Sequence, residues 1–370
     1  MAERAAPAER GPLVRFLGAY SLVHSVLGLL TSRMRSWWIA SWLPSWCPTS
    51  LHQLKDAEEK MLQNVKSSMS KRLVSIANGD ALWTLALGGP AGPESRTPLV
   101  LLHGFGGGVG LWTLNLDALC QQRPVYALDL LGFGQSSRPV FGSDAQEAEL
   151  QFVESIEQWR VSVGLEDMVL LGHNLGGYLA AAYALKYPAR VKHLVFVEPW
   201  GFPERPDPSD QERPIPVWIK ALGAMLSPFN PLAGLRVAGP LGPTLVQTLR
   251  PDFKKKYTSI FSDNTVTEYI YHLNVQTPSG ESAFKNMTIP YGWAKRPMLQ
   301  RVGLIDADIP MTVVYGSRSS IDGNSGTSIR ELRPNSHVEI ISIRGAGHYV
   351  YADQPDDFNQ EVLQVLASVS

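Results

Sequence analysis

The segment Gly172-His173-Asn174-Leu175-Gly176 has the spacing of a nucleophile elbow but lacks the nucleophile. In a G-x-S-x-G elbow, a serine stands on a sharp turn between a strand and a helix, where a histidine activates its hydroxyl. Asn174 occupies the serine position here. Because a carboxamide has no proton that a histidine can remove at neutral pH, Asn174 cannot become an attacking oxygen. The sequence therefore argues against ordinary serine hydrolysis.

The other parts of a hydrolase site follow in the expected chain order. A glycine-rich turn after an expected strand would present backbone N–H groups to an oxyanion. This oxyanion-type loop comprises His103, Gly104, Phe105 and Gly106. Asp322 and His348 each follow a later strand, which gives the order elbow, acid, histidine that α/β-hydrolases share. We therefore interpret Asn174, Asp322 and His348 as a degenerate triad.

A second motif overlaps His348. Residues 348–353 read H-x-x-x-x-D, a spacing that glycerolipid acyltransferases use, with the histidine as base for the acceptor hydroxyl and the aspartate to orient it. His348 and Asp353 are therefore candidates for acyl transfer. The motif is short and arises often by chance, so we rank this interpretation below the degenerate triad. Hydrolysis through another hydroxyl is a third alternative, but no second G-x-S-x-G is present.

The bulk composition narrows the class of protein. A chain of 370 residues suits one large α/β domain with an insertion, or two small domains. Its formal net charge of −1 argues against nucleic acid as a partner. Cys47 and Cys120 are the only cysteines, so we expect neither a disulfide framework nor a metal site, and we expect a reducing compartment.

Strands and helices alternate through most of the chain. A helix over residues 51–69 precedes a hairpin whose strands cover 73–76 and 81–87. Later strands are expected at 98–102, 124–128, 168–171, 191–197, 309–315 and 338–343, and helices at 145–163, 176–187 and 356–369. This alternation predicts the α/β class, with an α/β-hydrolase fold and a mostly parallel sheet covered on both faces.

The predicted organisation has five parts, of which the fourth interrupts the alternation with a segment rich in proline and aromatic residues. They are an apolar, tryptophan-rich lipid-surface anchor (1–50), a connecting helix (51–72), the first part of the core (73–197), an inserted helical cap (198–305) and the second part of the core (306–370).

The lipid-surface anchor is predicted from a cluster of tryptophans. They are Trp37, Trp38, Trp42 and Trp46. Tryptophan favours the boundary between lipid and water, because its ring is apolar and its N–H needs a partner. The preceding apolar stretch, residues 13–30, is interrupted by Arg15 and His24, so we prefer a surface-lying segment to a spanning helix or a signal peptide. Packing of the rings on the core is the alternative.

Two further features are candidates for regulation or contact. A run of three lysines precedes Thr258 and Ser259, which a basophilic kinase could phosphorylate, although we prefer a solvated basic face. Arg318 stands near the mouth of the expected pocket. It is a candidate for contact with a partner or a lipid headgroup, and an ordinary surface arginine explains it equally well.

Five segments resemble the α/β-hydrolase-domain co-activators of adipose triglyceride lipase, which are lipid-droplet proteins also described as 1-acylglycerol-3-phosphate O-acyltransferases. The resembling segments are residues 42–50, the elbow with Asn174, and residues 197–206, 274–301 and 347–355. A sister lipase family shares most of these segments but carries serine at the elbow, so Asn174 decides between the two. The apolar stretch at 13–30 departs from the family pattern, which begins with a short polar lead.

The resemblance implies a pseudo-hydrolase of the cytoplasm and the lipid-droplet surface. Such a protein would bind a patatin-type triacylglycerol lipase of the adipose triglyceride lipase type and shift it toward an active state. Perilipin-type coat proteins would compete for it. No cofactor is implied, and an acyl chain or acyl-CoA is the candidate ligand of the pocket. The alternative function is CoA-dependent acylation of lysophosphatidic acid by His348 and Asp353.

Overall fold

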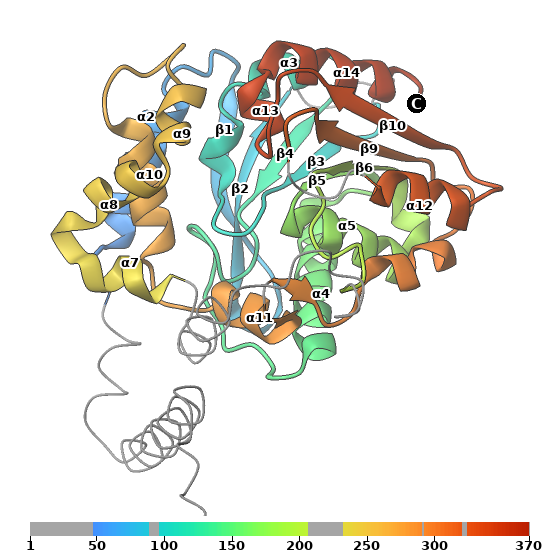
Figure 1. The fold of residues 1–370 in the computed structure, drawn as a ribbon, viewed down its shortest axis with the longest axis horizontal. Coiled ribbons are helices and arrows are strands. Elements are labelled where there is room, and N and C mark those ends of the chain that lie inside the picture. The colour runs from blue at the N-terminus through green and yellow to red at the C-terminus, as the bar shows by residue number, and fades with distance from the viewer. Residues whose placement is uncertain (1–46, 89–95, 206–231, 291, 320–323, 370) are drawn as a thin grey trace, which may run out of the picture. The chain divides into compact units, whose positions relative to one another are not determined.

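The computed structural model describes residues 47–88, 96–205, 232–290, 292–319 and 324–369. The chain divides into two units, Met1–Trp46 and Cys47–Ser370, and the described residues all belong to the second. Figure 1 shows this unit as a central twisted sheet with helices on both of its faces.

An eight-stranded sheet organises the fold, in the order β1-β2-β4-β3-β5-β6-β9-β10. Its strands are β1 (Met69–Ser75), β2 (Ala81–Leu87), β3 (Leu99–Leu102), β4 (Val125–Leu128), β5 (Met168–His173), β6 (Val191–Val197), β9 (Met311–Gly316) and β10 (Val338–Ile343). Strand β2 pairs antiparallel with both of its neighbours, and all other pairs are parallel. This arrangement confirms the predicted fold class.

Two hydrophobic clusters cover the two faces of the sheet. Leu99 and Leu101 of β3 belong to one cluster, and Val100 and Leu102 to the other, because successive side chains of a strand point to opposite faces. The flanking helices are α2 (Leu51–Leu62), α3 (Leu116–Leu119), α4 (Ala145–Val163), α5 (Leu175–Lys186), α12 (Ser325–Leu332), α13 (Val350–Asp353) and α14 (Pro355–Ala367). Within the described ranges, no helix is both long and apolar enough to cross a membrane.

The helix predicted over residues 51–69 is shorter in the structure and ends at Leu62. The Asp117 carboxylate accepts hydrogen bonds from the backbone N–H groups of Lys66 and Ser67, and these bonds turn the chain toward β1. Helix α2 is also more than a connector, because Leu54 and Met61 are completely buried in the core.

Between β6 and β9 the chain forms a cap. Its described elements are α7 (Ala233–Ala238), α8 (Gly242–Leu249), α9 (Pro251–Lys256), α10 (Thr265–Asn274), α11 (Gly280–Met287) and the short hairpin of β7 (Thr288–Ile289) and β8 (Trp293–Ala294). In Figure 1, helices α7 to α10 gather with α2 at one side of the sheet, and α11 lies near α4.

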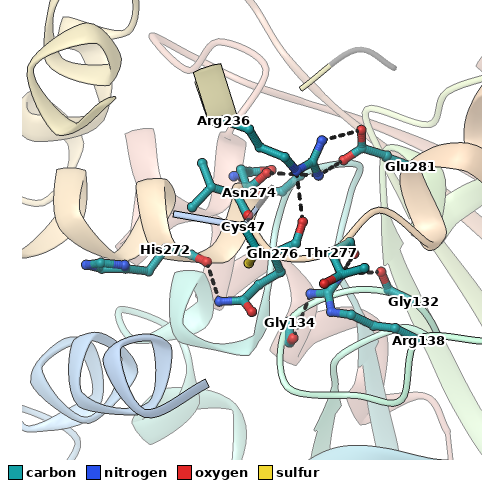
Figure 2. Close-up of polar contacts among 12 residues, drawn as sticks. Cys47, Gly132, Gly134, Arg138, Arg236, His272, Asn274, Gln276, Thr277 and Glu281 are labelled. Carbon is teal, nitrogen blue, oxygen red and sulfur yellow. Dashed lines mark hydrogen bonds and ion pairs between the residues drawn. The ribbon is translucent and has the colours of Figure 1, made fainter. Parts of the chain in front are cut away.

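A buried ion pair holds the cap segment that joins α10 to α11. Arg236 of α7 pairs with Glu281 of α11, and their side chains are 3% and 4% exposed. The Nε of Arg236 also donates to the Gln276 carbonyl at 2.9 Å (Figure 2). From the loop after β4, Arg138 donates to the Thr277 carbonyl at 2.9 Å. The joining segment is thereby tied to α7, to α11 and to the core.

Candidate functional site

The elbow forms where β5 runs into α5. Asn174 has φ 51° and ψ −113°, a backbone conformation that residues with side chains seldom adopt. Two glycines make the turn sterically possible. A Cβ at Gly172 would lie 2.2 Å from the Gly176 carbonyl oxygen, and a Cβ at Gly176 would lie 2.3 Å from that of Leu102. The turn therefore holds Asn174 in the strained geometry that a nucleophile elbow requires.

The Asn174 side chain engages the predicted oxyanion-type loop. Its Oδ1 accepts a hydrogen bond from the backbone N–H of Phe105 at 3.3 Å. In a hydrolase, a donor at this place serves the carbonyl oxygen of the substrate as that oxygen becomes negative. Here the amide oxygen of Asn174 occupies the donor. The elbow thus lacks a nucleophile, and its asparagine side chain already accepts from a backbone N–H of the predicted oxyanion-type loop.

His103 and the cap hold this loop in place. The Nε2 of His103 accepts from the Leu130 N–H at 3.0 Å, so its Nδ1 carries the proton and donates to the Gly104 carbonyl at 2.8 Å. Burial lowers the pKa of His103 to about 4, which keeps the ring neutral at physiological pH. On the other side, the Nδ2 of Asn274 in α10 donates to the Gly106 carbonyl at 2.9 Å.

Next to His348 lies a glutamate that the sequence patterns did not single out. The Nδ1 of His348 is 3.7 Å from Oε2 of Glu198, whose side chain is completely buried. Glu198 follows β6 directly and has φ 46°. Its Oε1 accepts from the Gly316 N–H and its Oε2 from the Ser319 hydroxyl, both at 2.7 Å. These bonds fix the carboxylate at the carboxyl ends of β6 and β9, which is the edge of the sheet that bears the elbow.

Asp322, the acid predicted for the degenerate triad, lies outside the described residues. Among the described carboxylates, the one paired with His348 is that of Glu198. The sequence did contain a signal for Glu198, since it directly follows the strand predicted over residues 191–197. The predicted bounds instead make Glu198 the first residue of the cap.

Asp353 has different partners from those that the acyltransferase motif suggests. Its Oδ1 forms an ion pair with the Lys256 ammonium at the end of α9. Its Oδ2 accepts from the Gly347 N–H at 2.8 Å. Among the described residues, Asp353 therefore joins residues 344–349, here called the histidine loop, to the cap, whereas the carboxylate beside His348 is that of Glu198.

His173 links the elbow to the histidine loop. Its Nε2 donates to the His348 carbonyl at 3.1 Å, and the two rings have centroids 4.7 Å apart. Burial, with a smaller contribution from the nearby His348, lowers the pKa of His173 well below its usual value. The neutral ring of His173 therefore serves as a structural link beside Asn174.

The remaining predicted site residues lie on the surface or outside the described chain. The Arg318 side chain is exposed, while its backbone N–H donates to the Ala346 carbonyl at 2.8 Å, close in sequence to His348. Thr258 and Ser259 are exposed just after α9. The four tryptophans of the predicted lipid-surface anchor, Trp37, Trp38, Trp42 and Trp46, lie outside the described residues.

The comparisons with known proteins agree with the fold. A family model described as the alpha/beta hydrolase fold matches residues 97–355. The human protein named 1-acylglycerol-3-phosphate O-acyltransferase ABHD5 is 68% identical over 335 residues, which cover 90% of this chain and 95% of that protein. The protein of that name from Rattus norvegicus is 68% identical over 334 residues, with the same coverage of both chains. The chain therefore belongs to the α/β-hydrolase family and, within it, to the ABHD5 group, as the sequence resemblance predicted.

More distant relatives include enzymes. A (Lyso)-N-acylphosphatidylethanolamine lipase of Bos taurus is 53% identical over 334 residues, covering 90% of this chain and 96% of that protein. Among solved structures, carboxylesterase CesB of Bacillus subtilis aligns with a TM-score of 0.60 at 19% identity, covering 85% of this chain and 98% of that one. The epoxide hydrolase CorEH aligns with a TM-score of 0.60 at 22% identity, covering 81% and 99%. These two structures share the fold.

Replacing Asn174 by serine alone should not restore efficient ester hydrolysis. The 3.7 Å between His348 Nδ1 and Glu198 Oε2 is longer than a hydrogen bond, so a histidine acting on the new hydroxyl would be poorly oriented. A misplacement of about 1 Å can cost on the order of 100-fold in rate. We expect Asn174→Ser to hydrolyse p-nitrophenyl esters about 100-fold more slowly than a serine-bearing lipase relative.

Labelling with a fluorophosphonate probe checks the same point independently of turnover. The native protein should remain unlabelled, and Asn174→Ser should label slowly. The matched control, Asn174→Ser combined with His348→Ala, should not label at all. Hydrolysis by Asn174→Ser at the rate of the lipase relative would show that the rest of the site is fully aligned and would contradict the prediction.

Proposed function

We propose that this protein is a member of its family that does not cleave esters and instead activates a patatin-type triacylglycerol lipase at the lipid-droplet surface. The observation that carries the proposal is the hydrogen bond from the Phe105 N–H to the side chain of Asn174. An acyl-enzyme pathway needs both an ionisable nucleophile and a free oxyanion donor. The elbow offers neither, while the frame around it is retained, so a role in binding accounts for the fold better than a role in ester cleavage.

A contact surface for the lipase is proposed around the histidine loop. Arg318 is exposed there, and its backbone is held by the Ala346 carbonyl. A guanidinium on a well-held loop can pair with a carboxylate of a partner in a defined geometry. Binding would shift the lipase toward its active state, and perilipin-type coat proteins would compete for the activator. The tryptophan-rich segment would concentrate the protein at the droplet surface from the cytoplasm.

Purified protein should raise fatty-acid release when it is added to a purified patatin-type lipase and a triglyceride emulsion. Asn174→Ala should activate as well as the native protein, because the proposed role needs no chemistry at the elbow. Deleting residues 1–46 should lower activation on lipid droplets but not on detergent-dispersed substrate, since only the droplet assay depends on the anchor. Fatty-acid release by the protein alone, without the lipase, would overturn the proposal.

A second candidate function is CoA-dependent acylation of lysophosphatidic acid. It is favoured by the name of the relatives at 68% identity, 1-acylglycerol-3-phosphate O-acyltransferase. In this function, His348 would act as base toward the acceptor hydroxyl, and acyl-CoA would be the acyl donor. The neighbouring Glu198 carboxylate would favour the imidazolium that forms.

Labelled acyl-CoA and lysophosphatidic acid test the second candidate directly. If His348 is the base, His348→Ala should lower the rate of phosphatidic acid formation on the order of 100-fold. Asp353→Asn should have a smaller effect, because the structure joins Asp353 to Lys256 and to the Gly347 backbone. Product formation that survives His348→Ala combined with Asp353→Ala would come from a contaminating enzyme and would remove this candidate.

A further inference from the structure

We propose that Asn174 is itself a substrate of the residual hydrolase machinery, which hydrolyses the side-chain amide to a carboxylate. The activity is an autocatalytic deamidation, and the modified residue is the elbow residue. This proposed activity is separate from lipase activation and does not depend on it.

The first observation is that the amide oxygen occupies the donor that the carbonyl of an acyl substrate would use. Its oxygen, Oδ1, accepts from the Phe105 N–H at 3.3 Å, the contact that an oxyanion hole makes with the carbonyl it polarises. A donor at this position stabilises negative charge that develops on the oxygen when the carbonyl carbon is attacked. This hydrogen bond polarises the carbonyl group of Asn174.

The second observation is that the histidine loop lies against the elbow. His173, next in the chain to Asn174, donates to the His348 carbonyl at 3.1 Å. The backbone N–H of Asn174 donates to the Val197 carbonyl at 3.0 Å, and Val197 directly precedes Glu198. These hydrogen bonds place the backbone of His348 and the end of β6 beside the elbow.

The third observation concerns the orientation of the His348 ring. Its Nδ1 faces the Glu198 carboxylate at 3.7 Å, so Nε2 is the ring nitrogen directed away from that carboxylate. The His348 side chain is 26% exposed, which gives water access to it, while the Glu198 side chain is completely buried. A buried carboxylate beside Nδ1 stabilises the imidazolium that forms when Nε2 accepts a proton.

The proposed step balances with water as the only co-reactant. Water attacks Cγ of Asn174 and gives one proton to Nε2 of His348, while the carbonyl electron pair moves onto Oδ1 beside the Phe105 N–H. The Cγ–Nδ2 bond then breaks, and Nδ2 takes the proton from His348 and leaves as ammonia. One amide and one water become one carboxylic acid and one ammonia. The acid ionises to a carboxylate that still accepts from Phe105.

This route differs from ordinary asparagine deamidation, in which the next backbone nitrogen attacks Cγ and forms a cyclic imide. That reaction is fastest where glycine follows, and the imide opens to both aspartate and isoaspartate. Asn78, exposed and followed by Gly79, is the site in this chain that suits it. At Asn174 the next residue is Leu175, the first residue of α5. Direct hydrolysis there would give aspartate alone, so Asn78 provides an internal control.

Peptide mass spectrometry of the full-length protein, incubated at neutral pH in oxygen-labelled water, tests the proposal. Conversion of the amide to the acid adds about 1 Da in ordinary water and more with the labelled oxygen. We expect the peptide containing residue 174 to convert with time, with aspartate as the only product. His348→Gln should slow this conversion on the order of 100-fold, and Glu198→Gln should slow it as well.

The rate at Asn78 should be the same in all three proteins, because its chemistry does not involve the elbow. Equal Asn78 rates and unchanged circular dichroism spectra identify variants that remain folded, and Glu198→Asp serves as a second variant if Glu198→Gln does not fold. Three results would overturn the proposal. They are an unconverted Asn174 when Asn78 has fully converted, conversion at an unchanged rate in a folded His348→Gln, and isoaspartate at residue 174.

Discussion

The hydrogen bond between the Phe105 N–H and the Asn174 side chain is the interaction on which the functional account depends. The strained turn at the elbow places an amide oxygen against the Phe105 N–H. In hydrolases, a backbone donor at this position binds the carbonyl oxygen of the substrate. Together with the missing nucleophile, the bond is a reason why a chain with the fold of a hydrolase is not expected to cleave esters. It also leaves a polarised carbonyl carbon within a site that retains a histidine and a buried glutamate.

The cap reaches this interaction through the oxyanion-type loop. Asn274 donates to the carbonyl of Gly106, and Phe284 of α11 stacks on Phe105 with ring centroids 4.3 Å apart. The buried pair of Arg236 and Glu281 ties α7 to α11, the helix that carries Phe284. On the other side of the site, Lys256 at the end of α9 holds Asp353 of the histidine loop. We therefore expect a rearrangement of the cap to change the geometry of both the elbow and the loop that carries His348.

Local signals made much of the fold predictable from the sequence. The helix at 145–163 has its predicted bounds because Asp144 caps its first turn and Gly164 ends it in a left-handed conformation. The pairing of His348 with Glu198 was missed because their contact depends on how β6, β9 and β10 are placed in the sheet. The partners of Asp353 were likewise hidden, since spacing within H-x-x-x-x-D does not reveal an ion pair with a lysine of the cap.

Hydrogen exchange at the Phe105 amide, followed by NMR in the native protein and in Asn174→Ala, tests the central claim most directly. A hydrogen bond of this kind contributes about 1 kcal/mol, so the account predicts that exchange at Phe105 becomes several-fold to about tenfold faster in Asn174→Ala. The amide of Val109, which donates to Asp129 at 2.9 Å in the same region, should keep its rate. Equal protection of Phe105 in the two proteins would contradict the claim that Asn174 occupies the oxyanion donor.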